Sequence, residues 1–383
     1  MKIMIVNTLY SPYKIGGAEV SVQFLAEEFV AMGHNVRIIC LHSEKNKKTD
    51  IINGVEVVYL PLKNIYWPYG SNDSHGKIKK LIWHFCDSYN LAMARVFRKE
   101  LIDFEPDVVH TNNISGFSVS IWNEVKRKKI KLIHTARDYY LFHPSSTLYI
   151  KEKNLNPDTF SVYIWSLLKK IQSAKVDVFI GISDFIRDFH VDNSFFKRAN
   201  CNTIYNSVET DLVSKKTSEH TVIGFIGRLT EDKGFNQFCE IAEKLKGKDN
   251  IEFVAAGRFN SGCVGEALDK RARDAGIDIL GFIPLISFLE KVDSVVLPIK
   301  WREPFGRTVV ECAMSEKIVL TNALGGVSEL EKLLPNIYRI DESTLNNILR
   351  LRPRAFSEDE KAIFNKGVIA KAYINAYKIT SNV

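Results

Sequence analysis

The chain has 383 residues, of which 45% are hydrophobic and 25% charged, so it is long enough for two cores and has a globular composition. Its net charge is +7, and residues 1–200 carry the whole surplus, with 27 Lys and Arg against 20 Asp and Glu. These values exclude a disordered or collagen-like chain, and the six cysteines lie too far apart for a disulfide framework or a metal site. Apolar runs are too short to span a bilayer, and we expect a cytoplasmic protein with reduced thiols.

Short runs rich in β-branched residues alternate with amphipathic segments along the whole chain. Strands are predicted first at 3–7, 36–41, 55–60, 108–111, 132–135 and 178–182, and then at 222–226, 251–255, 279–282, 295–298 and 318–321. Helices are predicted between them, for example at 18–32, 235–245 and 308–314, and in the tail at 358–378. Apolar strands separated by helices are typical of parallel sheets covered by helices on both faces.

Two such series predict an α/β fold with two Rossmann-like, doubly wound domains that face each other across a cleft. We expect an N-terminal domain at 1–205, a C-terminal domain at 206–355, and a helix at 356–383 that packs back on the N-terminal domain. The polar stretch at 213–220 is the expected linker. Ligands of such sheets bind beyond the carboxyl ends of the strands, so the cleft is the expected site.

The first predicted strand leads into Gly16 and Gly17 at the start of a helix. Two glycines at this position allow a ligand to approach the backbone, and the amides of a helix start favour an anion. A purely structural turn explains the same pair. The fingerprints G-x-G-x-x-G and G-x-x-x-x-G-K-[ST] do not occur, which argues against a dinucleotide oxidoreductase and a P-loop ATPase.

Arg228 follows the first strand of the second series, and Lys233 precedes the next helix. Together they can converge on one diphosphate, with the guanidinium as a fork and the ammonium as a point charge. Each residue alone would fit a solvated surface charge equally well.

Glu303 and Glu311 stand on either side of a predicted loop-to-helix transition. The amides of Gly306, Arg307 and Thr308 at the helix start suit a phosphate or sugar hydroxyls. The alternative is an ordinary amphipathic helix with a solvated Glu311, but the nearby Arg–Lys turn argues against it.

These motifs resemble those of nucleotide-sugar-dependent glycosyltransferases with the GT-B fold, and more narrowly the retaining glycosyltransferase family four (glycosyl transferases group 1). The resemblance covers essentially the whole chain. Its most specific parts are Gly-Arg-Leu-Thr-x-x-Lys-Gly at 227–234 and the two glutamates at 303 and 311. The segments 16–19, 134–141, 182–183 and 204–208 support it.

The resemblance implies a role for each matching residue. Arg228 and Lys233 would neutralise the donor diphosphate, Glu303 would hold hydroxyls of the donor sugar, and Glu311 would accept hydrogen bonds from the ribose. The other donor-binding residues that it implies are Gly16, Gly17, Ile283, Phe305, Gly306, Arg307 and Thr308. The catalytic set would be Glu303, Arg228, Lys233 and Asn112.

The chain departs from the family pattern in two places. Where many members have His-x-His this sequence has His110-Thr-Asn112, and the common His-Asp pair is Arg137-Asp138. Asparagine cannot act as a base, so we expect the departing phosphate to take the acceptor's proton and Asn112 and Arg137 to orient substrates. The acceptor side would comprise His110, Asn112, Arg137 and Asp138, although His110 and His134 fit buried structural histidines equally well.

Two basic clusters of the N-terminal half, at 75–85 and 124–131, bear on the acceptor. Basic and apolar residues on one helix could bind an anionic membrane surface and reach a lipid-linked acceptor. Alternatively, Leu81, Trp83 and Phe85 pack into the core and the lysines are solvated. Nothing resembles a nucleic-acid-binding module, so no nucleic-acid partner is expected. Oligomeric state stays open.

The resemblance implies hexosyl transfer with retention from a UDP- or GDP-linked sugar to an acceptor hydroxyl of a lipid-linked or free saccharide. Family habit places this reaction in bacterial surface polysaccharide or lipopolysaccharide assembly, on the inner face of the cytoplasmic membrane. No metal or other cofactor is expected, because no Asp-x-Asp is present. The alternatives are an epimerase or a phosphorylase of the same fold, and a non-catalytic partner that binds sugar or nucleotide.

Overall fold

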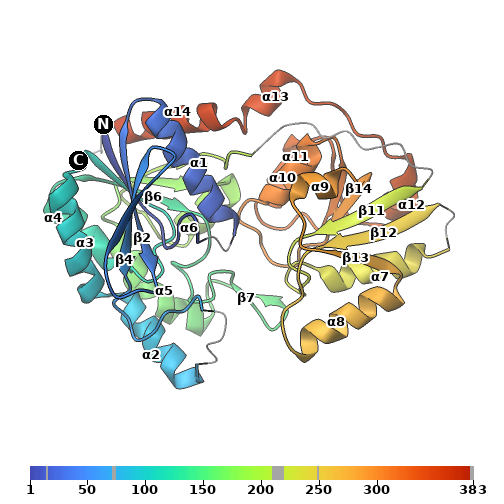
Figure 1. Ribbon diagram of the computed structural model, residues 1–383, viewed down its shortest axis with the longest axis horizontal. Coiled ribbons are helices and arrows are strands. Elements are labelled where there is room, and N and C mark those ends of the chain that lie inside the picture. Colours follow the sequence, from blue (N-terminus) through green and yellow to red (C-terminus); the bar gives the residue numbers. More distant parts are fainter. Residues whose placement is uncertain (14–15, 71–74, 209–219, 248–249, 380–383) are drawn as a thin grey trace. The chain divides into compact units, whose positions relative to one another are not determined.

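The computed structural model describes residues 1–13, 16–70, 75–208, 220–247 and 250–379 (Figure 1). The chain forms two units. Unit 1 comprises Met1–Leu148, Leu155–Ser207 and Asn365–Val383, and unit 2 comprises Tyr149–Asn154 and Val208–Phe364. All of the expected linker at 213–220 except residue 220 lies outside the described residues.

Unit 1 is built on an eight-stranded sheet with the order β10-β9-β6-β5-β1-β2-β4-β3, in which only the β3–β4 pair is antiparallel. Its strands are β1 (Lys2–Val6), β2 (Asn35–His42), β3 (Lys48–Ile52), β4 (Val55–Pro61), β5 (Val108–Thr111), β6 (Lys131–Ala136), β9 (Val178–Gly181) and β10 (Asn200–Thr203). Its helices are α1 (Gly17–Ala31), α2 (Lys77–Ser88), α3 (Leu91–Phe104), α4 (Ser120–Arg127), α5 (Phe160–Ser173), α6 (Asp184–Asp192) and α14 (Lys366–Lys378). Strand β1 pairs with β2 and β5 in register, so the carboxyl ends of these strands lie at one edge.

The C-terminal helix α14 packs on α1 and closes the core on one face of this sheet (Figure 1). Tyr377 meets Phe29 of α1 with ring centroids 5.6 Å apart. The tail is not one continuous helix, because Asn365 caps a new one: its side chain accepts hydrogen bonds from the backbone N–H groups of Gly367 and Val368. The preceding helix α13 (Glu358–Ala362) belongs to unit 2.

Unit 2 is built on a six-stranded parallel sheet with the order β13-β12-β11-β14-β15-β16. Its strands are β11 (Thr221–Ile226), β12 (Ile251–Ala256), β13 (Ile277–Gly281), β14 (Ser294–Leu297), β15 (Ile318–Thr321) and β16 (Ile337–Arg339). Its other helices are α7 (Phe235–Leu245), α8 (Cys263–Asp274), α9 (Leu285–Leu289), α10 (Arg307–Met314), α11 (Val327–Leu333), α12 (Glu342–Asn347) and the 3₁₀ turn η1 (Ile348–Arg350).

A hairpin of β7 (Tyr149–Ile150) and β8 (Lys153–Asn154) also belongs to unit 2. The Asn154 side chain donates to the carbonyl of Lys300 at 2.9 Å and accepts from the backbone N–H of Arg302 at 3.0 Å. The sequence placed this segment in the first domain, and the structure moves it to the second. Because the two hydrogen bonds join positions almost 150 residues apart, local sequence patterns could not reveal them.

The predicted fold class is confirmed, with two Rossmann-like parallel sheets in one chain. Strand β1 shows why the sequence pattern was readable, since Ile3, Met4, Ile5 and Val6 are all completely buried between neighbouring strands and helices on both faces. Among the described residues, no helix is both long enough and apolar enough to cross a membrane.

Candidate active site

In unit 2, charged side chains follow the carboxyl ends of neighbouring parallel strands. Arg228 follows β11, Arg258 follows β12, and the segment from Lys300 to Glu303 follows β14. In open parallel sheets this edge is where ligands bind. Unit 2 therefore collects cations and a carboxylate where an anionic, hydroxyl-rich ligand would be expected.

Lys233 and Glu303 form a partly buried ion pair at this edge, with Lys233 Nζ 2.8 Å from Glu303 Oε2. The same ammonium group lies 5.2 Å from the centre of the Trp301 ring. The turn before α7 is pressed against this loop, because a Cβ on Gly234 would lie 1.8 Å from the carbonyl oxygen of Pro298. A side chain at position 234 would thus push the Lys233 turn away from Glu303.

Two other cations of this edge, Arg228 and Lys300, are also paired with carboxylates. Arg228 Nη2 lies 2.7 Å from Asp232 Oδ2, and the Arg228 side chain is 60% exposed. Lys300 pairs with Glu231. Binding of a diphosphate would exchange protein carboxylates for phosphate oxygens at these cations, so the cations are already placed and need little rearrangement.

Helix α10 begins directly after Gly306, which has a φ of 95° and no side chain that could cap the helix. Arg307 Nε donates to Glu311 Oε1 at 2.6 Å, so the second carboxylate of the motif is held one turn into the helix. Phe305 is buried against Phe364. Glu303 therefore lies in the loop before α10, and Glu311 lies one turn into the helix.

Arg258 is a candidate that the sequence reading missed. Its guanidinium lies 5.0 Å from the centre of the exposed Phe282 ring, and Phe282 precedes Ile283, one of the expected donor-binding residues. A recognisable signal was present, because Gly257-Arg258 repeats the Gly227-Arg228 pattern at the next strand end. A Cβ on Gly257 would lie 1.8 Å from the carbonyl oxygen of Gly227, so glycine is required where these strand ends meet.

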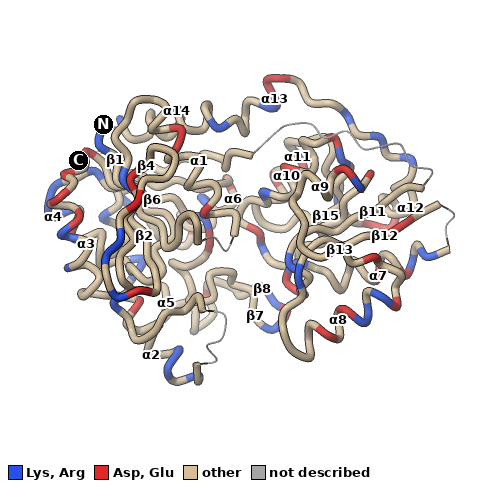
Figure 2. The backbone as a smooth tube through the Cα atoms, viewed as in Figure 1, with Lys and Arg blue, Asp and Glu red and all other residues tan. Residues whose placement is uncertain are grey.

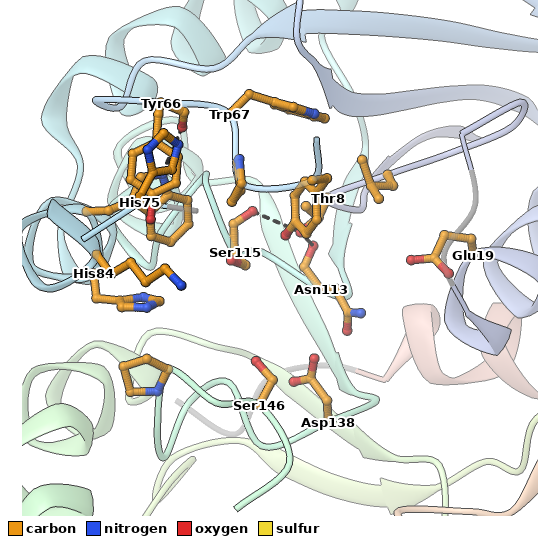
Figure 3. Close-up of a pocket in the computed structure, with 16 residues that line it drawn as sticks. Thr8, Glu19, Tyr66, Trp67, His75, His84, Asn113, Ser115, Asp138 and Ser146 are labelled. Carbon is orange, nitrogen blue, oxygen red and sulfur yellow. Dashed lines mark hydrogen bonds between the residues drawn. The ribbon is translucent and has the colours of Figure 1, made fainter. Parts of the chain in front are cut away.

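Unit 1 has its own pocket of about 430 Å³ at the carboxyl ends of β1, β5 and β6 (Figure 3). Backbone hydrogen bonds fix these strand ends, as Thr8 N–H donates to the carbonyl of Asn113 at 2.8 Å. The pocket is lined by Thr8, Leu9, Glu19, Tyr66, Trp67, Pro68, Tyr69, His75, Lys80, Trp83, His84, Asn113, Ser115, Asp138, Pro144 and Ser146. Aromatic faces combined with hydroxyl, amide and carboxylate groups suit a sugar.

Two carboxylates approach this pocket from different elements (Figure 3). Glu19 of α1 accepts a hydrogen bond from the N–H of Gly16 at 2.8 Å, so this residue, which the sequence reading did not place in the site, holds the predicted glycine turn. Asp138 accepts from the N–H of Tyr140 at 2.8 Å. Burial and, to a smaller extent, the charge of Glu19 raise the pKa of Asp138 to about 6. Gly17 begins α1 beside them and is exposed.

Arg137 and Asn112, the two departures from the family pattern, contact each other. Arg137 Nε donates to Asn112 Oδ1 at 2.8 Å, and Arg137 Nη1 donates to Asn206 Oδ1 at 2.5 Å. Because the guanidinium needs an acceptor, it fixes the orientation of the Asn112 amide. Asn112 Nδ2 then points away from Arg137 and, although buried, has no hydrogen-bond partner among the described residues.

His110 and His134 lie in the core and do not line the pocket. The two ring nitrogens of His110 contact Thr135 Oγ1 and the hydroxyl of Tyr377, each at 2.7 Å. His134 Nδ1 lies 3.0 Å from Thr111 Oγ1, and burial lowers the pKa of His134 to about 3. The structure therefore brings Asp138 to the pocket and Asn112 beside Arg137, but it places His110 among core contacts.

A buried charge cluster next to the pocket was not anticipated. Lys169 of α5 is almost fully buried, donates to the carbonyl of Tyr140 at 2.6 Å and lies 3.8 Å from the centre of the Tyr140 ring. Asp87 of α2 accepts from the N–H of Gly116 at 2.6 Å. Burial raises the pKa of Asp87 to about 6 and lowers the pKa of Lys169 to about 8, while each group favours the charged form of the other.

Comparison with known proteins identifies the family. Residues 15–212 match the model of Glycosyltransferase Family 4, and residues 209–343 match that of Glycosyl transferases group 1. The chain belongs to glycosyltransferase family 4. It is 44% identical over 379 residues to a 42.6 kDa protein in the cps region of Klebsiella pneumoniae, covering 99% of this chain and 100% of that protein.

Solved structures agree with the fold of this family 4 glycosyltransferase. Sucrose-phosphate synthase from Thermosynechococcus elongatus matches with a TM-score of 0.74 at 14% identity, covering 98% of each chain. Anabaena HepE, solved in complex with UDP and glucose, matches with a TM-score of 0.62 at 16% identity, covering 99% of this chain and 97% of the other. The chain is therefore a GT-B glycosyltransferase.

Proposed function

We propose that this glycosyltransferase moves a hexosyl group from a UDP- or GDP-linked sugar to an acceptor hydroxyl, with retention of anomeric configuration. The observation that carries the proposal is the arrangement of unit 2, where the Lys233–Glu303 pair and the start of α10 follow adjacent parts of one sheet edge. Family membership and the fold of Anabaena HepE, which was solved with UDP and glucose, support a nucleotide-sugar donor.

The main requirement of this reaction is stabilisation of the leaving group by cations. Negative charge develops on the departing diphosphate, and Lys233 and Arg228 would stabilise it as their carboxylate partners are displaced. Glu303 would then accept hydrogen bonds from hydroxyls of the sugar, and Glu311 from those of the ribose. Asn112 has no proton to gain or lose, so the departing phosphate would take the proton of the acceptor hydroxyl.

The proposed setting is surface polysaccharide or lipopolysaccharide assembly at the inner face of the cytoplasmic membrane. The relative encoded in the cps region supports polysaccharide synthesis. Of the two basic clusters, the one at 124–131 is largely used within the fold, since Lys126 pairs with Asp177 and Arg127 with Glu124. In the cluster at 75–85 the large apolar side chains differ in burial, because Trp83 is buried whereas Leu81 and Phe85 are exposed.

The proposal can be tested without knowing the acceptor. Sugar nucleotides with α-linked UDP or GDP would be incubated with the enzyme, and proton NMR would record the anomer released first by hydrolysis. We expect one nucleotide series to be cleaved to the α-anomer, by wild type and by the control Lys244→Ala on the opposite end of α7, but not by Lys233→Ala. Initial release of the β-anomer would refute retention, and the absence of cleavage with every donor would refute the donor assignment.

A further inference from the structure

Helix α5 is amphipathic, but it buries its polar side and exposes its apolar side. The residues that it buries are mostly polar, namely Val162, Ser166, Lys169, Gln172 and Ser173. Its outward stripe is made of large apolar side chains at helical spacing, namely Phe160, Tyr163, Ile164, Leu167, Leu168 and Ile171, all of which are exposed. A soluble surface helix normally has the opposite arrangement. Exposure of a contiguous apolar stripe indicates a surface that is covered when the protein works.

Helix α2 continues the same surface. Its exposed apolar residues Ile78, Leu81, Ile82 and Phe85 have the spacing of one helix face. The two helices are in contact, and Phe85 meets Trp165 of α5 with ring centroids 5.1 Å apart. The outward stripes of α2 and α5, which we call the α2–α5 face, therefore form one apolar surface.

The exposed charges on the two helices are positive, and outside the helices the acid nearest to them along the chain is Asp158, which is exposed just before α5 and interacts with Lys170. Lys77 and Lys79 are exposed at the start of α2, and Lys170 lies beside the stripe of α5. Figure 2 shows the basic start of α2 in blue. Both helices are fully described, and their only carboxylate is the buried Asp87. Apolar side chains bordered by lysines, with no exposed acid on either helix, match the headgroup and acyl regions of an anionic leaflet.

A second copy of the chain fits this face less well. In a symmetric dimer the same patch meets itself, so the lysines of α2 would approach one another without a carboxylate from either helix to pair with them. An anionic bilayer provides the missing counter-charge and also covers the apolar stripes.

We propose that the α2–α5 face docks on an anionic phospholipid bilayer. The polar side of α2 supplies Lys80, Trp83 and His84 to the pocket of unit 1, so that pocket lies beside the docked surface. Resting on the proposed function, this placement assigns the acceptor to lipid-anchored saccharides, whose sugar enters the pocket while the lipid stays in the leaflet. The buried Lys169 cluster then has a clear role, because it stabilises the polar side of α5 inside the protein and leaves the apolar side for the bilayer.

The test is flotation of the full-length protein with vesicles of phosphatidylcholine, with and without phosphatidylglycerol. Wild type should float only with the anionic vesicles. Ile164→Glu should reduce partitioning by about tenfold or more, because it removes apolar contact and adds a negative charge. The matched control is Ile102→Glu on α3, where the replaced side chain is 53% exposed compared with 47% for Ile164. Lys79→Gln should weaken binding by about fivefold, and Lys128→Gln on the exposed end of α4 should not.

Each outcome separates this proposal from the proposed function. Failure of wild type to float, or equal flotation of Ile164→Glu and wild type, would overturn docking even if nucleotide sugars bind. Flotation without binding of any nucleotide sugar would leave docking intact and refute the transferase proposal. A dimer in size-exclusion chromatography that Ile164→Glu converts to a monomer would assign the face to a second copy and overturn the bilayer.

Discussion

Lys169→Met tests the inverted packing of α5. Methionine keeps an unbranched, apolar side chain of similar length but removes the charge that Asp87 and Asp138 interact with. The variant loses a charged hydrogen bond to the Tyr140 carbonyl, worth about 1.5–3 kcal/mol, and a cation–π contact worth up to about 2 kcal/mol. Removing one partner of a buried ionic group typically costs about 3–5 kcal/mol, which agrees with the sum of these parts.

The pKa values of the neighbouring aspartates predict how the destabilisation of Lys169→Met changes with pH. Burial raises the pKa values of Asp87 and Asp138 to about 6, above the ordinary value of 3.8 for an aspartate. The contribution of these two groups to folding stability therefore falls as the pH rises from about 4 to about 6. Lys169 opposes both shifts. In Lys169→Met the two pKa values should rise further and the loss should continue above pH 6. The variant is therefore destabilised more at pH 8 than at pH 5.

Urea unfolding followed by tryptophan fluorescence measures this effect in unit 1, because four of the chain's five tryptophans lie there. Lys170→Met is the control, since Lys170 is the adjacent, partly exposed lysine and its loss should cost no more than about 1 kcal/mol. Equal destabilisation of Lys169→Met at pH 5 and pH 8, or an equal effect of Lys170→Met, would refute the reasoning.

Two further substitutions test how the two units hold their site residues. Gly234→Ala should destabilise unit 2 by at least about 2 kcal/mol more than the control Gly247→Ala. Both glycines have positive φ, but only an alanine at position 234 would place its Cβ against Pro298. Equal losses of stability in thermal unfolding would contradict the close contact between Gly234 and Pro298. Arg137→Lys should cost unit 1 about 1.5–3 kcal/mol, since the single nitrogen of a lysine lacks the rigid fork by which Nε and Nη1 reach the two amide oxygens. Arg198→Lys on the surface should be neutral, and equal melting temperatures of the two variants would show that the fork is unimportant.

The parallel strands could be predicted because burial on both faces gives an unbroken apolar run, as in Val295 to Leu297 of β14. Strands β3 and β10 escaped prediction, since β3 is an exposed edge strand of mixed polarity and β10 reads Asn-Cys-Asn-Thr. Arg228 and Glu303 could be placed after strands because the preceding apolar runs are readable, whereas their roles toward a donor rest on the family resemblance. The stripe of α5 has clear helical periodicity, but periodicity does not state which side faces the core.

The pocket of unit 1 was only partly predictable. Asp138 follows a predicted strand and was named, whereas Glu19, Trp67 and Lys80 come from three elements that only the tertiary fold brings together. Lys169, the buried lysine of α5, is followed directly by Lys170, and nothing in the local sequence distinguishes the two. The burial of Lys169 depends on Asp87, which is 82 positions away and is itself buried among residues of another helix.

Binding of the nucleotide-sugar donor tests the central claim most directly. A thermal-shift panel of UDP- and GDP-sugars would be measured on wild type, Glu311→Ala and the control Glu290→Ala at the exposed end of α9. A ligand that binds only the folded state raises Tm. We predict that one nucleotide series raises the Tm of wild type and Glu290→Ala but leaves that of Glu311→Ala unchanged. No shift with any donor on folded wild type, or an equal shift in Glu311→Ala, would contradict the assignment of the donor site to unit 2.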